Sequence, residues 1–194
     1  MQRGKVLILV AGIPGAGKTR FANYLSEKLQ IALICKDKLK EIIWDQVQYD
    51  TTERENTLVY GRLAYDLSFH FCETLMKASQ PIVFESNFTK PADDILQPMV
   101  QKYDYKVINV LFSGDYEMIY RRFAEREKTS ERHPGLVAST GYVDDFQSFK
   151  NATQNCKNFR YGDIVIDVDA TDFSKLSYDD LTEEILAYMR IRIG

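Results

Sequence analysis

KVLILVAGIPGAGKT, at residues 5–19, is the stretch that decides the fold of this 194-residue chain. Its first half is a continuous apolar run from Val6 to Val10, which is typical of a buried strand. Its second half, Gly12 to Thr19, fits the spacing G-x-x-x-x-G-K-[ST]. A strand that passes through a glycine-rich turn directly into a helix is the context that this spacing requires.

The chemistry of the loop explains its spacing. Glycines let the backbone turn tightly, so that its N–H groups point inward at a polyphosphate. Lys18 adds a positive charge for the β- and γ-phosphates, and Thr19 offers a hydroxyl to Mg²⁺. We therefore predict that ATP and Mg²⁺ bind here; the structural alternative is a glycine-rich turn with an exposed lysine. The predicted nucleotide-binding residues of the loop are Gly12, Ile13, Pro14, Gly15, Ala16, Gly17, Lys18 and Thr19.

Length and composition indicate one soluble domain over residues 1–194. The formal net charge is −3, so no global field attracts the chain to nucleic acid or to an anionic membrane. The first apolar run follows Arg3 and Lys5 like a signal peptide, but it leads straight into the loop without a cleavage site. No stretch is long enough to span a bilayer. The three distant cysteines suit a reducing compartment, and we expect a cytoplasmic protein.

Strand-like and helix-like runs alternate along the chain. Five strands separated by helices predict an α/β fold: a three-layer structure with a parallel five-stranded sheet covered on both faces. Thr52 to Glu55 matches a capping box and predicts the start of the longest helix. The predicted strands are 5–11, 31–35, 82–85, 105–112 and 163–168, and the predicted helices begin near 18, 37, 52, 91, 115, 142 and 177.

The carboxyl ends of the predicted strands gather polar residues, and ligands of such sheets bind at this edge. Asp37 follows the second strand, where it can orient a phosphoryl acceptor and receive its proton, or only cap a helix. Lys40, one helical turn on, can hold an acceptor anion or be a solvated lysine. Glu85 ends the third strand and suits a place near Mg²⁺, with Ser86 and Asn87 as hydrogen-bonding groups next to it; the alternative is an ordinary turn.

A second cluster of charge follows the fourth strand. Arg122 and Arg126 are four residues apart, so they share a helix face and either meet a phosphate or form a solvated charged face. Arg132 adds a third donor in an irregular stretch, and we predict a lid at about 126–142. His133 is a turn residue or a substrate contact. Thr171, after the last strand, lies in a loop that could border the adenine.

In these motifs the chain resembles a small P-loop kinase. It is similar to the group that contains the kinase domain of polynucleotide kinase, the zeta-toxin kinases and chloramphenicol phosphotransferase, and most of all to predicted small bacterial P-loop kinases with an AAA-type ATP-binding domain. The resemblance covers the whole chain in element order. Its motifs are GIPGAGKT at 12–19, KDKLK at 36–40, ESNF at 85–88 and RRFAERE at 121–127.

The resemblance implies a role for several residues. Asp37 would be the acceptor base, Ser86 and Asn87 acceptor or phosphate contacts, and Arg122 and Arg126 lid arginines on the transferring phosphate. In polynucleotide kinase an arginine stands where this chain has Lys40, and an aspartate where it has Glu85. Lysine does not clamp a phosphate bidentately, which disfavours a nucleotide-phosphate acceptor.

The sequence therefore predicts an ATP-dependent phosphotransferase that moves the γ-phosphate to a hydroxyl of a small molecule. One alternative is a 5′-hydroxyl nucleic-acid kinase, which the net charge disfavours. Another is a nucleotide-dependent switch or regulatory ATP-binding protein. The sequence does not identify the acceptor, the preference for ATP or GTP, or the oligomeric state.

Overall fold

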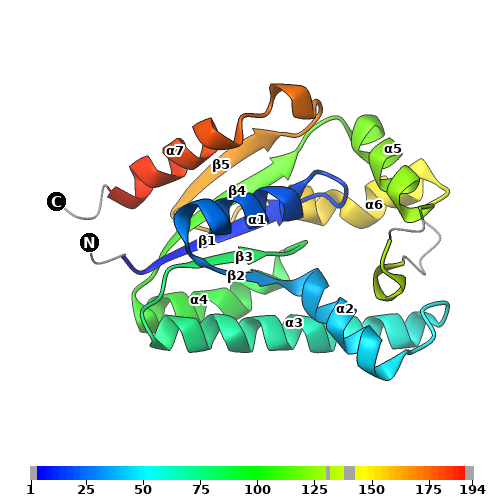
Figure 1. Cartoon of the computed structure of the whole chain (residues 1–194), viewed down its shortest axis with the longest axis horizontal. Helices are drawn as coiled ribbons and strands as arrows, with labels where there is room; N and C mark the ends of the chain where they lie inside the picture. Colours follow the sequence, from blue (N-terminus) through cyan, green and yellow to red (C-terminus); the bar gives the residue numbers. More distant parts are fainter. Residues whose placement is uncertain (1–3, 130–131, 138–142, 191–194) are drawn as a thin grey trace.

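The five apolar runs form one parallel sheet in the computed structural model, which describes residues 4–129, 132–137 and 143–190. The strands are β1 (Val6–Gly12), β2 (Ala32–Cys35), β3 (Ile82–Glu85), β4 (Lys106–Ser113) and β5 (Ile164–Asp169). Their order is β2-β3-β1-β4-β5, and every pair is parallel. The central β1 brings the loop that follows it to the middle of the carboxyl edge (Figure 1).

Helices cover both faces of this sheet, which confirms the predicted fold class (Figure 1). Alternate residues of β1 point to opposite faces, so Ile8 belongs to one core and Leu9 to the other. The first core lies under α1, α5, α6 and α7, and the second under α3 and α4. The helices are α1 (Lys18–Leu29), α2 (Lys36–Val47), α3 (Arg54–Lys77), α4 (Pro91–Tyr103), α5 (Tyr116–Glu127), α6 (Phe146–Lys157) and α7 (Tyr178–Arg190), with short 3-10 turns η1 (Pro134–Leu136) and η2 (Phe173–Lys175).

Two predicted helix starts differ from the structure. The capping box at 52–55 is wrong: α3 begins at Arg54, its cap Glu53 makes no side-chain bond, and Thr52 donates instead to Asp50. The helix predicted from 142 begins at Phe146, because the Asp145 carboxylate accepts from the amides of the first turn. Short polar side chains choose among nearby amides, so sequence spacing alone does not locate these caps.

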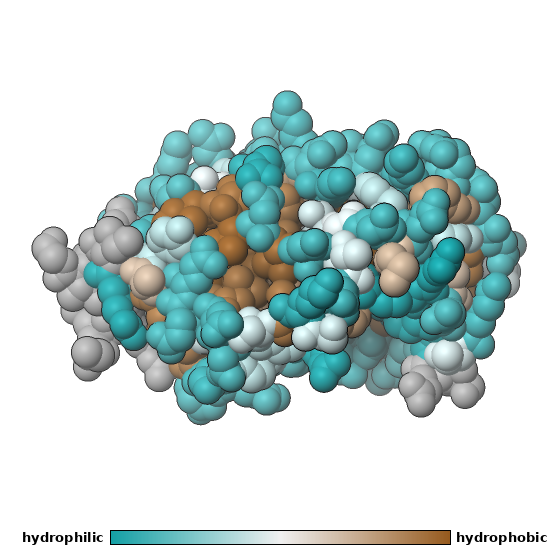
Figure 2. Space-filling model, turned by 90° about the horizontal axis from the view of Figure 1, so that it is seen from above, coloured by the Kyte–Doolittle hydropathy of each residue, from teal (hydrophilic) through white to brown (hydrophobic). Residues whose placement is uncertain are grey.

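The surface in Figure 2 is mostly hydrophilic, as the share of charged residues in the sequence predicts. On the face that Figure 2 shows, mostly hydrophilic side chains surround a central apolar area. No helix within the described ranges is both long and apolar enough to cross a bilayer. The thiols of Cys35, Cys72 and Cys156 are free, and the last two are buried.

Candidate active site

The loop after β1 depends on glycine at the positions that the motif specifies. Gly12 has a φ of +127°, and a Cβ there would lie 1.9 Å from the carbonyl oxygen of Phe112. Gly15 and Gly17 both have a φ of +85°, in the left-handed region that side chains disfavour. This backbone path is therefore restricted to glycine, and it brings the chain back over the end of β1.

Two of the predicted phosphate-binding residues instead hold the loop in shape. The amide of Ile13 donates to Phe112 O at 3.1 Å, and the amide of Ala16 donates to Ile13 O at 3.2 Å. Both side chains are fully buried in the first core. The amides that suit a phosphate are those of the first turn of α1, at Lys18 and Thr19, because a helix has no acceptor of its own for them.

Lys18 is held beneath the loop. Its Nζ donates to the carbonyl oxygen of Ile13 at 2.9 Å, and only 5% of the residue is exposed. Burial lowers the pKa of Lys18, although the nearby carboxylates of Glu85 and Asp37 favour its charged form. No described residue forms an ion pair with this buried ammonium, so it is poised to accept the negative charge of a phosphate.

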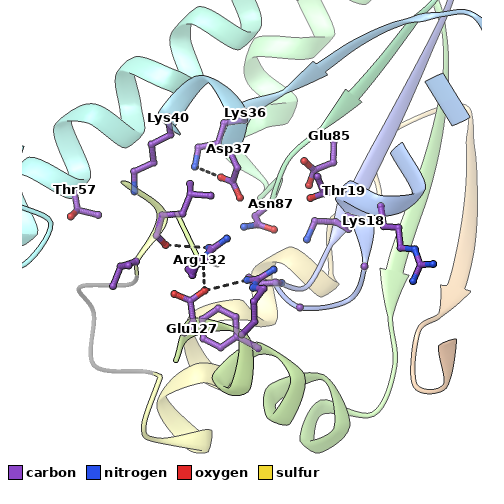
Figure 3. A pocket seen from close by; sticks show the side chains of 18 residues that line it. Lys18, Thr19, Lys36, Asp37, Lys40, Thr57, Glu85, Asn87, Glu127 and Arg132 are labelled. Carbon is purple, nitrogen blue, oxygen red and sulfur yellow. Dashed lines mark hydrogen bonds and ion pairs between the residues drawn. The ribbon is translucent and has the colours of Figure 1, made fainter. Parts of the chain in front are cut away.

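A pocket of about 360 Å³ opens in front of the loop (Figure 3). It is enclosed by the loop, the first turns of α1 and α2, the end of β3, the end of α5 and η1. The structure brings together there most of the residues predicted from the sequence: Pro14, Gly15, Gly17, Lys18, Thr19, Asp37, Lys40, Glu85, Asn87, Arg126 and Arg132. The predicted site is thus one continuous space.

Asp37 faces this pocket from the first turn of α2 and is not its N-cap, because α2 begins at Lys36 and Cys35 is the cap. Its carboxylate accepts a hydrogen bond from Lys36 Nζ at 2.9 Å, and 32% of its side chain is exposed. Burial opposes ionisation, but Lys36, Lys18 and Arg132 together outweigh it and lower the pKa of Asp37 to about 2. Asp37 is therefore a carboxylate at any physiological pH.

Lys40 is not a solvated lysine, which the sequence had left open. Only 7% of the residue is exposed, and its side chain points into the pocket (Figure 3). Burial, followed by the charge of Lys36, lowers its pKa to about 8. The amine is still mostly protonated at pH 7, so the pocket contains a charged group that burial destabilises.

Glu85 lies at the floor of the pocket and is 3% exposed. The thiol of Cys35 donates to its Oε2 at 3.0 Å. Burial raises the pKa of Glu85, against the opposing effect of Lys18. With the Thr19 hydroxyl, this carboxylate fits Mg²⁺, which uses one or two protein oxygens and completes its shell with phosphate and water. The described residues contain no group of three or more His, Cys, Asp or Glu that could hold a metal by itself.

The end of α5 and η1 close the pocket through an ion-pair cluster around one buried carboxylate. The side chain of Glu127, the residue after Arg126, is only 2% exposed. Its Oε1 pairs with Arg132 Nε at 2.8 Å and with Arg126 at 3.3 Å. Arg132 also donates to Leu136 O. Of the predicted lid at 126–142, residues 130–131 and 138–142 lie outside the described ranges.

Arg122 is separated from this cluster and does not line the pocket. Its guanidinium donates to Ala170 O at 2.5 Å and to Thr171 O at 3.4 Å, and it lies 4.0 Å from the centre of the Phe173 ring. The shared helix face predicted for Arg122 and Arg126 does not bring both into the pocket, because only Arg126 lines it. Arg122 instead fixes the loop after β5, whose Phe173 packs on Gly17.

Ser86, Thr171 and His133 also lie outside the pocket lining. Ser86 is buried, with its amide bonded to Val10 O. The Thr171 hydroxyl accepts from the amide of Asp115. His133 Nε2 lies 3.1 Å from Asp45 Oδ1, and its Nδ1 accepts from the Gly135 amide, so this side chain attaches η1 to α2.

The Zeta toxin family model matches residues 1–177. The chain belongs to this family. Among curated proteins, none matches the sequence. This Zeta toxin family member is similar in fold to a candidate kinase from Chloroflexus aurantiacus, with a TM-score of 0.77, 22% identity and 98% of both chains covered.

Two further solved structures share the fold of this Zeta toxin family member. A shikimate kinase from Bacteroides thetaiotaomicron has a TM-score of 0.58 and 14% identity over 95% of this chain and 98% of its own. A gluconokinase from Sinorhizobium meliloti has a TM-score of 0.54 and 12% identity over 97% of this chain and 93% of its own. These likenesses and the family together show a small P-loop kinase fold.

Several pocket residues of this Zeta toxin family member were not predicted as site residues, and three of them contribute polar groups opposite the loop. Lys36 pairs with Asp37, Glu127 holds the two arginines, and Thr57 lines the pocket from α3. The charge alternation at 36–40 and 125–127 contained a signal for the first two, because buried carboxylates need such partners. The sequence contained no such signal for Thr57, because its position in the pocket depends on how α3 packs against α2.

Proposed function

We propose that this chain is a kinase that transfers the γ-phosphate of ATP to a hydroxyl group of a small molecule. The observation that carries the proposal is that Asp37 and Lys18 face one pocket, at the ends of α2 and the phosphate loop. An ionised carboxylate beside a phosphate-binding lysine is the pairing that hydroxyl phosphorylation requires.

The nucleotide end of the pocket is formed by the loop, Lys18, Thr19 and Glu85. In the proposed complex Lys18 moves its ammonium from Ile13 O to the β- and γ-phosphates. Thr19 and Glu85 would hold Mg²⁺, which when bound neutralises charge on the phosphate oxygens. Three free cysteines fit a reducing compartment, and we propose a cytoplasmic enzyme.

The acceptor hydroxyl would donate its hydrogen bond to Asp37. A bond forms between this oxygen and the γ-phosphorus, the bond from the γ-phosphorus to the β–γ bridging oxygen breaks, and the hydroxyl proton passes to Asp37. A carboxylate with a pKa of about 2 is a weak base. Its main contribution is orientation, because in a loose transition state little proton transfer precedes bond cleavage.

We propose Arg126 as the lid residue that stabilises the transferring phosphate; its place in the pocket lining at the end of α5 supports this role. We propose one domain with a lid at about 126–142, in which Glu127 orients Arg126 and Arg132. Two structural neighbours are described as a shikimate kinase and a gluconokinase, which act on small hydroxylated molecules, and this supports a small acceptor. The net charge of −3 argues against nucleic acid.

The test is ADP release from Mg-ATP by the wild type and by Lys18→Ala and Asp37→Asn, with Lys38→Ala as a matched control on an exposed lysine of α2. The panel contains sugars, polyols, hydroxy acids, nucleosides and a 5′-hydroxyl oligonucleotide. We expect stimulation by a small acceptor, abolished in Lys18→Ala and lowered at least a hundredfold in Asp37→Asn with ATP binding retained. Stimulation by the oligonucleotide alone, or unchanged transfer in Asp37→Asn, would overturn the proposal.

A further inference from the structure

Among the cations at the acceptor end of the pocket, around Asp37, Lys40 is the one that no described residue pairs with. It makes no hydrogen bond or ion pair with any residue in the described ranges, although it is 7% exposed. The two cations beside it have partners. Lys36 pairs with Asp37 at 2.9 Å, and Arg132 pairs with Glu127 at 2.8 Å.

The position of Lys40 separates it from the nucleotide. Figure 3 shows Lys40 and Lys18 on opposite sides of Asp37. The charged groups near each residue are consistent with this separation. Asp37 interacts with both lysines, whereas the other charged groups near Lys40 are Lys36, Arg132 and Glu127, and not Lys18. The triphosphate that the loop and Lys18 bind therefore leaves Lys40 available.

A buried, unpaired ammonium destabilises a folded protein unless something compensates it. An apolar residue at position 40 would avoid this loss of stability, and the charge of Lys40 forms no hydrogen bond or ion pair within the described residues that would offset it. The compensation then comes from a ligand that enters the pocket with negative charge. Lysine presents a point charge without the bidentate geometry of arginine, so it accepts a carboxylate and a phosphate ester equally.

We propose that the acceptor is a small hydroxylated anion whose charged group binds Lys40 while its hydroxyl binds Asp37. This inference rests on the proposed kinase function and names its substrate class. Lys40 and Asp37 are three residues apart on α2, so their side chains are neighbours on the helix surface and the anionic group and the reacting hydroxyl belong to one compact molecule. The pocket of about 360 Å³ also includes the space in front of the phosphate loop, so the acceptor has only part of it and must be small, such as a hydroxy acid or a sugar phosphate.

The experiment measures binding without turnover. The wild-type protein is saturated with Mg²⁺ and a non-hydrolysable ATP analogue, so that the nucleotide end is filled. Calorimetric titrations then compare neutral glucose with two anionic relatives, gluconate and glucose 6-phosphate. Titrations with acetate and with inorganic phosphate show whether the site binds a carboxylate or a phosphate group. The same titrations are repeated with Lys40→Met and Lys40→Arg, and with Lys38→Met as the control, because Lys38 is 67% exposed and pairs with Glu41.

We expect the anionic member of at least one pair to bind at least tenfold more tightly than its neutral partner in the wild type and Lys38→Met. Lys40→Met removes this difference, and Lys40→Arg retains part of it. Equal binding of anionic and neutral members, no binding by any of them, or unchanged preference in Lys40→Met would overturn the inference. A bound anion that stimulates no ADP release would instead contradict the kinase function, so the two failures are distinguishable.

Discussion

The thiol of Cys35 donates a hydrogen bond to the carboxylate of Glu85, with 3.0 Å between Sγ and Oε2. The two residues are register partners at the carboxyl ends of β2 and β3. Burial, followed by the charge of Glu85, raises the pKa of the thiol, so Cys35 stays protonated and remains a donor. This bond orients the carboxylate that we assign to Mg²⁺.

Replacing Cys35 should therefore weaken the binding of Mg²⁺ to the enzyme. In Cys35→Val the buried carboxylate loses its donor, and we expect the Mg²⁺ concentration for half-maximal rate to rise three- to tenfold. The free energy of unfolding should fall by about 1–3 kcal/mol. Cys35→Ser should behave closer to the wild type. Cys72→Val, a buried thiol of α3 outside the pocket, is the control, and equal Mg²⁺ curves for the two valine variants would contradict the prediction.

Gly12→Ala should destabilise the fold. Its Cβ would lie 1.9 Å from Phe112 O, at a φ that only glycine adopts easily, so β1 and β4 would have to separate. We expect a loss of about 2–4 kcal/mol in urea unfolding. Gly61→Ala, in the middle of α3 with nothing within 4 Å of the new Cβ, should instead gain up to about 1 kcal/mol. Similar unfolding midpoints for both variants would contradict the assignment of strain.

Substitutions of Arg126 and Arg122 should have different effects on activity and stability. Arg126 lines the pocket, and Arg126→Met should lower kcat by about a hundredfold or more through lost stabilisation of the phosphate. Arg122→Met removes the bonds to Ala170 and Thr171 and the contact with Phe173. We expect it to raise the KM for ATP and to lower thermal stability more than it lowers kcat. The reverse pattern would show that Arg122, not Arg126, reaches the phosphate.

Anion binding at Lys40 should depend on pH with a definite sign. The pKa of Lys40 is lowered to about 8, so its charge is present below that pH and is lost above it. Affinity for the anionic acceptor should then fall above pH 8, approaching tenfold per pH unit. The groups that face Lys40 are Lys36, Arg132, Glu127 and Asp37, whose pKa of about 2 adds no change between pH 5 and 9. Lys40→Arg should show a flat profile over the same range, and a bend near pH 8 in that variant would assign it to another group.

The sequence alone predicted the local part of this protein. The strand, the loop at 12–19 and α1 are contiguous, and glycine spacing encodes their backbone path directly. The parallel sheet also followed from the alternation of strand and helix, because this pattern has few packed solutions. The strand ends then located Asp37 and Glu85, since the carboxyl ends of parallel strands meet at one edge.

Only the tertiary structure decided which charges face the pocket. Periodicity shows which residues share a helix face but not what covers that face, so Arg122 was grouped with Arg126 and the burial of Glu127 was not predicted. The burial of Lys40 depends on how α2, α3 and η1 pack, and η1 is held by the His133–Asp45 contact across 88 positions of sequence. Contacts of that range are set by the whole fold, whereas the phosphate loop is determined by eight consecutive residues.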